Sequence, residues 1–310
     1  MPGPVAVIDI GSNSIKVLVA VRGADGTIIP LHVRSLDARI SAGISHAEPR
    51  LSEDGMARGL GAIRGLLADA DRFSAEKIVL VATSAVRDAR NGHAFRVEVR
   101  AATGHDIRIL SGDEEANLIG RGLTCDPALR HLRDFFVFDL GGGSLEGLAF
   151  RDRQIAQAAS LPLGCVRLTE KFVPDPAAPL AAAARDAINA HVRAEFARTG
   201  FRFAPRAEAI GTGGTVATAR AVLGARRGQT FDQTAPTISA AELRELADWL
   251  GGLPLAERQR IPGLPAARAD VFPTALVTLL AVAELGGFPD FRNSLYNLRY
   301  GLADETLGDA

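Results

Sequence analysis

The stretch VAVIDIGSNSIKVLV, residues 5–19, has a second copy in VFDLGGGSLEGLA, residues 137–149. In each copy a short apolar run ends in an aspartate, and a glycine and a serine follow at the same spacing. The matched positions are Asp9 and Asp139, Gly11 and Gly141, and Ser14 and Ser144. This pattern predicts a strand, a tight turn and the start of another strand.

A glycine-rich turn at the end of a strand can direct backbone N–H groups outward, where they bind phosphate oxygens. Taken alone, one such turn is more typical of an ordinary connection between strands than of a phosphate site. Its presence in both halves of the chain favours phosphate binding. The repeat therefore predicts two related domains with a phosphate site between them.

Length, charge and cysteine content restrict the class of protein. The 310 residues suffice for two domains with separate cores, and the net charge of −1 gives no general attraction to nucleic acid or membranes. Cys125 and Cys165 have neither metal-ligand spacing nor a disulfide framework, which favours a reducing compartment. The N-terminus lacks the basic segment of a signal peptide, and no apolar run approaches the ~20 residues of a membrane span. We therefore expect a cytoplasmic protein without nucleic-acid or membrane partners.

Hydrophobic periodicity predicts the order βββαβαβ in the first half of the chain. The predicted strands are 5–10, 15–21, 27–36, 77–82 and 106–110. One helix is expected to begin after a Ser52 cap, and another to cover 96–102. The apolar residues at helical spacing in the first of these helices are Met56, Leu60, Ile63 and Leu67.

The opening order returns in the second half, with predicted strands at 134–140, 145–151, 154–161 and 208–211. A helix is expected to begin at Pro179 and to bury Ile188, Val192 and Phe196. Further helices are expected from about residue 215, after the 239–242 capping box, after Pro273 as far as 286, and over 295–307.

A capping box also opens the helix at Ser111-Gly112-Asp113-Glu114. Ser111 and Glu114 can satisfy each other's backbone N–H groups, which gives Glu114 a structural task. Glu115 lies about 100° further around the helix and has no such task. A favourable interaction with the helix dipole is the structural alternative for Glu115.

Five segments together resemble the exopolyphosphatase/guanosine pentaphosphate phosphatase family, which belongs to the superfamily of actin and the sugar kinases. They are IDIGSNSIK (8–16), SGDEEANLI (111–119), DLGGGSLE (139–146), GTGGT (211–215) and RADV (268–271). The resemblance implies an α/β fold of two ribonuclease H-like domains (βββαβαβα) with an interdomain cleft and actin-like ATPase architecture. We expect domain I over 1–124, domain II over 125–293, and a C-terminal helix over 294–310 that packs on domain I.

The resemblance assigns Mg²⁺ as the cofactor, because hydrolysis of a phosphoanhydride needs its charge neutralised. Asp139 and Glu146 match the magnesium-side carboxylates, and Asp9 is the third candidate metal ligand. In the alignment of the two copies, Lys16 takes the place of Glu146, so the turns are expected to divide phosphate binding and metal binding between them. Alternatively, Asp9 and Asp139 hold their turns by side-chain hydrogen bonds.

The predicted phosphate-binding residues lie in both turns, in two further glycine or serine segments and in the RADV segment. They are Gly11, Ser12, Asn13, Ser14, Thr83, Ser84, Arg87, Gly141, Gly142, Gly143, Ser144, Gly213 and Arg268. For Ser84 and Arg87 the structural alternative is a helix cap with a solvated arginine, and for Asp270 it is a cap of the following helix. The 211–215 turn could equally serve close packing of a strand and a helix.

By resemblance, Glu115 is the catalytic base, the second glutamate of the family's SGxEEA motif. One departure is Leu145, where the family commonly has threonine, so one candidate phosphate donor is absent. The function implied is release of terminal phosphate from inorganic polyphosphate, from guanosine pentaphosphate, or from both, and the family also implies a homodimer. The alternatives are a non-catalytic sensor of guanosine polyphosphates or polyphosphate, and an ATP-dependent kinase of the same superfamily.

Overall fold

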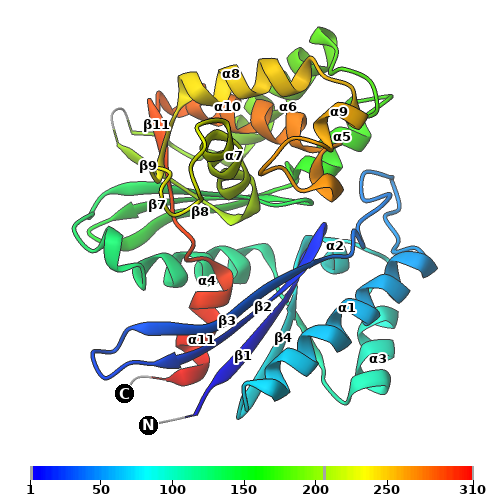
Figure 1. Ribbon diagram of the computed structural model, residues 1–310, viewed down its shortest axis with the longest axis vertical. Coiled ribbons are helices and arrows are strands. Elements are labelled where there is room, and N and C mark those ends of the chain that lie inside the picture. The colour runs from blue at the N-terminus through cyan, green and yellow to red at the C-terminus, as the bar shows by residue number, and fades with distance from the viewer. Residues whose placement is uncertain (1–2, 205–206, 309–310) are drawn as a thin grey trace. The chain divides into compact units, whose positions relative to one another are not determined.

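Two β-sheets, one in each of two compact units, form the framework of the protein in the computed structural model (Figure 1). The structure describes residues 3–204 and 207–308. Unit 1 comprises Met1–His131 together with Tyr296–Ala310, and unit 2 comprises Leu132–Leu295. The predicted α/β fold of two related domains is confirmed, since each unit begins with the same three-stranded meander.

The sheet of unit 1 has the strand order β3-β2-β1-β4-β5. Its strands are β1 (Val5–Ile10), β2 (Ser14–Arg22), β3 (Ile28–Asp37), β4 (Lys77–Ala82) and β5 (Ile107–Ile109). The first three pair antiparallel, whereas β4 and β5 add in parallel. All five predicted strands are therefore confirmed, with ends that differ by two residues or fewer.

The helices of unit 1 connect these strands and cover the sheet. They are α1 (Glu53–Arg72), α2 (Ser84–Arg87), α3 (Gly92–Thr103), α4 (Gly112–Thr124), the 3₁₀ turn η1 (Pro127–Leu129) and α11 (Leu298–Leu307). Ser52 caps α1 as predicted, because its hydroxyl accepts from the Gly55 N–H. Of the four apolar residues at helical spacing, Ile63 and Leu67 are buried, whereas Met56 and Leu60 are only half-buried. Leu66 and the glycines on its side of the helix also face the core.

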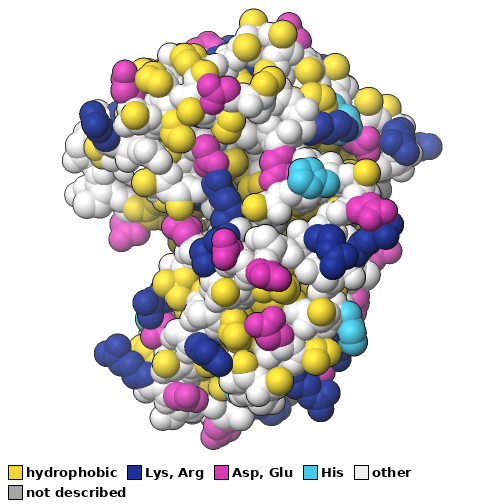
Figure 2. Space-filling view, turned by 90° about the vertical axis from the view of Figure 1, so that its right-hand side faces the viewer, with side chains coloured by type: hydrophobic (Ala, Val, Ile, Leu, Met, Phe, Trp, Pro, Cys, Tyr) yellow, Lys and Arg dark blue, Asp and Glu magenta, His cyan; other side chains and the backbone are white. Residues whose placement is uncertain are grey.

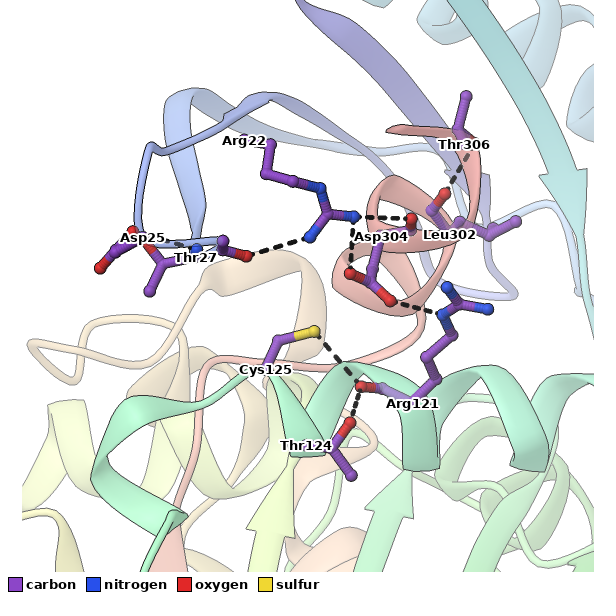
Figure 3. Close-up of polar contacts among 10 residues, drawn as sticks. Arg22, Asp25, Thr27, Arg121, Thr124, Cys125, Leu302, Asp304 and Thr306 are labelled. Atoms are coloured by element: carbon purple, nitrogen blue, oxygen red, sulfur yellow. Dashed lines mark hydrogen bonds and ion pairs between the residues drawn. The ribbon is translucent and has the colours of Figure 1, made fainter. Parts of the chain in front are cut away.

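Helix α11, red in Figure 1, comes from the C-terminal end of the chain but packs on β1, β2 and α4 within unit 1. Its Asp304 carboxylate accepts from Arg22 of β2 at 2.9 Å and from Arg121 of α4 at 2.6 Å (Figure 3). Asp304 thus fastens the last helix to both a strand and a helix that precede it by more than 180 positions.

The sheet of unit 2 repeats that of unit 1 and adds one edge strand. Its order is β10-β11-β9-β6-β7-β8, formed by β6 (Phe135–Leu140), β7 (Leu145–Arg151), β8 (Gln154–Leu161), β9 (Glu208–Thr212), β10 (Thr237–Ser239) and β11 (Asp290–Asn293). The short strands β10 and β11 were not predicted, because three or four residues are too few for a clear period-2 pattern.

The helices of unit 2 are α5 (Cys165–Phe172), α6 (Ala182–Thr199), α7 (Gly213–Arg226), α8 (Ala240–Gly251), α9 (Leu255–Arg258), the 3₁₀ turn η2 (Ala266–Arg268) and α10 (Phe272–Gly286). Helix α6 begins three residues after the predicted Pro179, and it buries Ile188, Val192 and Phe196 as expected. The capping box of α8 is confirmed. Helix α5 was not predicted, although it supports one of the two glycine turns.

Phenylalanine rings dominate the core of unit 2, where Phe136 and Phe138 of β6 contact Phe203 and Phe288. On the face of the molecule drawn in Figure 2, acidic and basic side chains alternate without a large patch of one sign. This distribution agrees with the net charge of −1. Within the described ranges, no helix is both long and apolar enough to cross a membrane.

Candidate functional site

The first turn, residues 11–14, connects β1 to β2 in unit 1. Ser12, Asn13 and Ser14 are buried, with 4%, 7% and 9% of their surface exposed. The Asn13 carbonyl accepts from the N–H groups of Ala38 and Arg39 at 3.1 and 2.9 Å, and the Ser12 carbonyl accepts from Ser41 at 3.3 Å. The chain that follows β3 therefore holds the carbonyl side of this turn.

The second turn, residues 141–144, is held in the same way in unit 2. The chain that follows β8 enters α5, whose first N–H groups donate to the turn carbonyls. Cys165 N–H donates to Gly141 O at 3.0 Å, and Val166 N–H donates to Gly142 O at 2.9 Å. The Arg167 Nε group donates to Gly143 O at 2.9 Å.

These contacts orient the peptide groups of both turns, because a carbonyl bonded on one side directs the following N–H to the other side. The N–H groups of Asn13, Gly142 and Gly143 donate to no backbone carbonyl in the turns, loops and helix caps of residues 3–204 and 207–308. Each unit therefore presents unused backbone donors, the arrangement that binds anions in a nest.

Gly164 allows α5 to approach the second turn. A Cβ atom at this position would lie 2.3 Å from the carbonyl carbon and oxygen of Gly142 and from the carbonyl carbon of Gly143. We expect Gly164→Ala to displace the turn or the helix, at a cost of about 1–3 kcal/mol in the free energy of unfolding. Urea unfolding would measure the cost, and Gly61→Ala is the control because a Cβ there has no neighbour within 4 Å. Equal stabilities of the two variants would contradict this role of Gly164.

The cross-strand partners of Asp9 and Asp139 distinguish the two turns. Asp9 of β1 lies opposite Lys16 of β2, whereas Asp139 of β6 lies opposite Glu146 of β7. Directly opposed residues on antiparallel strands have Cβ atoms ~5 Å apart on the same face, so like charges there destabilise the sheet. The strand register therefore gives unit 1 a compensated pair and unit 2 a pair of carboxylates.

Glu146 and Asp139 are fixed by neighbours in unit 2. Glu146 is only 2% exposed, and its Oε1 accepts from the Ser160 hydroxyl at 2.8 Å. Asp139 lies against the start of α7, where a Cβ on Gly213 would stand 2.1 Å from Asp139 Oδ1. Gly213 also has a φ of +77°, which glycine adopts without strain. Gly213 thus serves close packing, the alternative that the sequence left open for the 211–215 turn.

The carboxylate pair is too small to enclose a metal ion by itself. Within the described part of the chain, no group of three or more histidine, cysteine, aspartate or glutamate residues could hold a metal ion. One or two carboxylates are nevertheless the usual protein contribution to Mg²⁺, which keeps several waters and binds substrate phosphates. Asp139 and Glu146 fit that kind of site.

Glu115 lies in the first turn of α4, next to the confirmed capping box of Ser111 and Glu114. It is 6% exposed, and its Oε2 accepts from Arg87 Nη1 at 2.7 Å. Arg87 also donates to Leu110 O at 3.1 Å. The expectation that Glu115 has no structural task was wrong, since it forms a partly buried ion pair that joins α4 to the end of α2.

The capping box gives the protein a measurable pH dependence. Hydrogen bonds from the Ser111 N–H, Arg108 and the Ser111 hydroxyl lower the pKa of the Glu114 carboxyl to about 2. This is below the ~4.3 of an unfolded chain, so the contribution to stability is full above about pH 4.5 and is lost towards pH 2. We expect the difference in free energy of unfolding between wild type and Glu114→Gln to shrink over that range. Urea unfolding at pH 6, 4 and 2.5 tests this, and a constant difference would contradict it.

Thr83 and Ser84 connect β4 to α2 and lie beside the first turn. Both are buried, and the Ser84 hydroxyl lies 3.1 Å from the Ser12 hydroxyl. Thr83 occupies the N-cap position of α2 but makes no side-chain capping bond. The alternative of a serine cap with a solvated arginine is wrong, because Ser84 is not the cap and Arg87 is paired with Glu115.

Arg268 lies against the start of α7. A Cβ on Gly214 would stand 2.1 Å from Arg268 Nη1, and the guanidinium makes long contacts of 3.5 Å with the hydroxyls of Thr215 and Thr218. Its Nε is buried without a hydrogen-bond partner. Residue Val271, not Asp270, occupies the N-cap position of α10, so the capping alternative for Asp270 is wrong.

Several residues that shape the site were missed by sequence reasoning. They are Gly164 at the start of α5, Ser160 beside Glu146, and Arg39 behind Asn13. Each lies either on a neighbouring strand or in the segment that follows the third strand of its sheet. The repeat could have pointed to the segments after β3 and β8, since they are equivalent in the two units. Leu145, which follows the second turn, is fully buried.

The chain is similar to proteins of one family over nearly its whole length. Residues 18–309 match the family model of the Ppx/GppA phosphatase family. An uncharacterized protein of Streptomyces coelicolor is 33% identical over 273 residues, which cover 85% of this chain and 78% of that protein. The crystal structure of an exopolyphosphatase from Cytophaga hutchinsonii has a TM-score of 0.87 at 22% identity, with 98% and 97% of the two chains covered. The Aquifex aeolicus PPX-GPPA enzyme has a TM-score of 0.78 at 24% identity, with 98% and 99% covered.

Proposed function

Because the chain belongs to the Ppx/GppA phosphatase family, we propose that it is a magnesium-dependent phosphoanhydride hydrolase. Its substrates are inorganic polyphosphate, guanosine pentaphosphate, or both, from which it releases the terminal phosphate. The observation that carries this proposal is the pairing of Asp139 with Glu146 at the edge of a glycine turn with unused N–H donors. Two neighbouring carboxylates are suited to a cation such as Mg²⁺, and backbone donors are suited to an anion.

The two turns supply the phosphate contacts in this proposal. In unit 1 the donors are the N–H groups and hydroxyls of residues 11–14, supported by Thr83 and Ser84. In unit 2 they are the N–H groups of residues 142–144, the N-terminus of α7 at Gly213, and Arg268. The Gly141 N–H, which the sequence also suggested, donates to Ser144 O at 3.0 Å within the turn. Preorganised donors of this kind stabilise the charge that develops during phosphoryl transfer, because they need no rearrangement.

Asp139 and Glu146 are the residues that would hold Mg²⁺, with Asp9 as the third predicted ligand. A bound Mg²⁺ would neutralise charge on the phosphate oxygens. Ser160 donates to one oxygen of Glu146 and so limits the rotation of that carboxylate. Asp9 faces Lys16, whose positive charge makes unit 1 the more suitable side for phosphate.

Glu115 is the proposed general base that orients and deprotonates the attacking water. Arg87 fixes one carboxylate oxygen, Oε2, by an ion pair at 2.7 Å. A base held by one oxygen keeps the other in a defined direction, which favours a single geometry for proton transfer. Arg87 is also a predicted phosphate ligand, and these two roles are compatible because a guanidinium has five N–H donors.

A substrate panel tests the proposal. Purified protein is incubated with polyphosphate, guanosine pentaphosphate, or ATP with candidate acceptors, each with Mg²⁺ or with excess chelator, and phosphate release is measured. We expect Mg²⁺-dependent release from one or both of the first two substrates. Binding without turnover would indicate a sensor, and acceptor-dependent consumption of ATP would indicate a kinase; either result overturns the proposal. Glu115→Gln protein from a parallel preparation controls for contaminating phosphatases.

A further inference from the structure

Arg39, in the segment that follows β3, holds Asn13 at two points. Its backbone N–H donates to the Asn13 carbonyl at 2.9 Å, and its Nε donates to the Asn13 side-chain Oδ1 at 3.0 Å. Arg39 therefore donates to both oxygen atoms of Asn13, the backbone carbonyl and the side-chain Oδ1. Arg39 was not among the site residues expected from the sequence.

The backbone of Arg39 adopts a conformation that is unfavourable for its residue type. Its φ is +36°, on the left-handed side that glycine and asparagine visit more readily than arginine. A strained residue persists where the surrounding contacts outweigh the strain, and such residues cluster at functional sites. Here the contacts include the two hydrogen bonds to Asn13. The strain therefore indicates that the Arg39 side chain is needed to hold Asn13.

The other end of the Asn13 amide has no partner. Asn13 is 7% exposed, and its Nδ2 group is buried without a hydrogen-bond acceptor. The Asn13 Oδ1 accepts from Arg39. Rotation of the amide by 180° would break this hydrogen bond and would place the N–H₂ group against the positively charged guanidinium of Arg39. Arg39 therefore fixes the direction in which the unused Nδ2 donor points.

We propose that Arg39 is a positioning residue, which orients the Asn13 amide so that Nδ2 donates to a phosphate oxygen of the substrate. The inference rests on the proposed function, since it assigns the missing acceptor to the phosphate chain that the first turn binds. A buried donor without a partner is stabilised most by an anionic oxygen, because a charge-assisted hydrogen bond is stronger than one between neutral groups. Arg39 acts through Asn13 and needs no contact with the substrate itself.

Arg39→Gly separates this role from a structural one. Glycine keeps the N–H that donates to the Asn13 carbonyl and adopts positive φ without strain, so the variant should unfold at nearly the wild-type temperature. We expect its dissociation constant for inorganic tripolyphosphate, measured by calorimetry, to rise about 10-fold, the effect of one charge-assisted hydrogen bond. In the Asn13→Ala background the same substitution should have no further effect, because the amide that Arg39 orients is absent.

Arg58→Met is the matched control, since Arg58 is an exposed arginine of α1 that bonds the same segment after β3. It donates to the carbonyls of Ala38 and Arg39 at 2.9 and 3.2 Å but does not reach Asn13. We expect Arg58→Met to lower the unfolding temperature and to leave tripolyphosphate binding unchanged. Unchanged binding by Arg39→Gly, or an equal loss in the Asn13→Ala background, overturns the inference while the proposed function stands. Failure of wild type to bind either tripolyphosphate or guanosine pentaphosphate overturns both the inference and the proposed function. Binding without hydrolysis of either substrate overturns only the proposed function.

Discussion

Glu115→Gln is expected to reduce phosphate release by about 10²–10⁴-fold, the usual contribution of a positioned general base. Glutamine keeps an oxygen that accepts from Arg87, so the ion pair becomes a neutral-acceptor hydrogen bond and the protein stays folded. The free energy of unfolding should fall by about 1 kcal/mol, the difference between a charged and a neutral hydrogen bond. Steady-state kinetics with tripolyphosphate or guanosine pentaphosphate measure the first effect, and urea unfolding measures the second.

The neighbouring glutamate provides the matched control for this substitution. Glu114 lies one position earlier in the same helical turn, where its carboxylate bonds the Ser111 N–H at 2.8 Å as part of the capping box. Glu114→Gln should alter stability more than turnover, whereas Glu115→Gln should do the reverse. Retention of full activity by Glu115→Gln would remove this residue from the mechanism. A loss of substrate binding in place of turnover would make it a binding residue.

Glu146→Gln is expected to abolish the stabilisation of the protein by Mg²⁺. In the metal-free protein the variant should be as stable as wild type or more stable by about 0.5 kcal/mol, because it removes the like charge opposite Asp139. The glutamine oxygen can still accept from Ser160, and its N–H₂ group can donate to the Asp139 carboxylate. A ligand that binds only the folded state raises the unfolding temperature with its concentration, so loss of the site removes that dependence.

Thermal unfolding over a series of Mg²⁺ concentrations measures this effect without relying on activity. Glu284→Gln is the control, since Glu284 of α10 is a surface carboxylate of the same unit that pairs with Arg193 and Arg244. It should respond to Mg²⁺ as the wild type does. An equal response by Glu146→Gln would show that the metal is held elsewhere, and the assignment of Asp139 and Glu146 would then fail.

Local sequence patterns predicted most of the secondary structure near the site. The strands that flank both turns were placed within two residues, because apolar runs bounded by glycine and small polar residues determine a strand–turn–strand unit locally. The capping box at Ser111 was also predicted, since its two partners are three residues apart. The short strands and α5 were missed because their conformation depends on the elements that they pack against.

The sequence by itself determined the repeat: two aspartate–glycine–serine turns in equivalent positions, with Lys16 in one copy where the other has Glu146. These features are local, so spacing alone reveals them. Only the tertiary structure decided that Arg87 holds Glu115 and that Arg39 holds Asn13. These pairs are 28 and 26 positions apart and meet because strands and helices bring them together. Contacts of that kind depend on the packing of whole elements, and no local pattern of residue types encodes them.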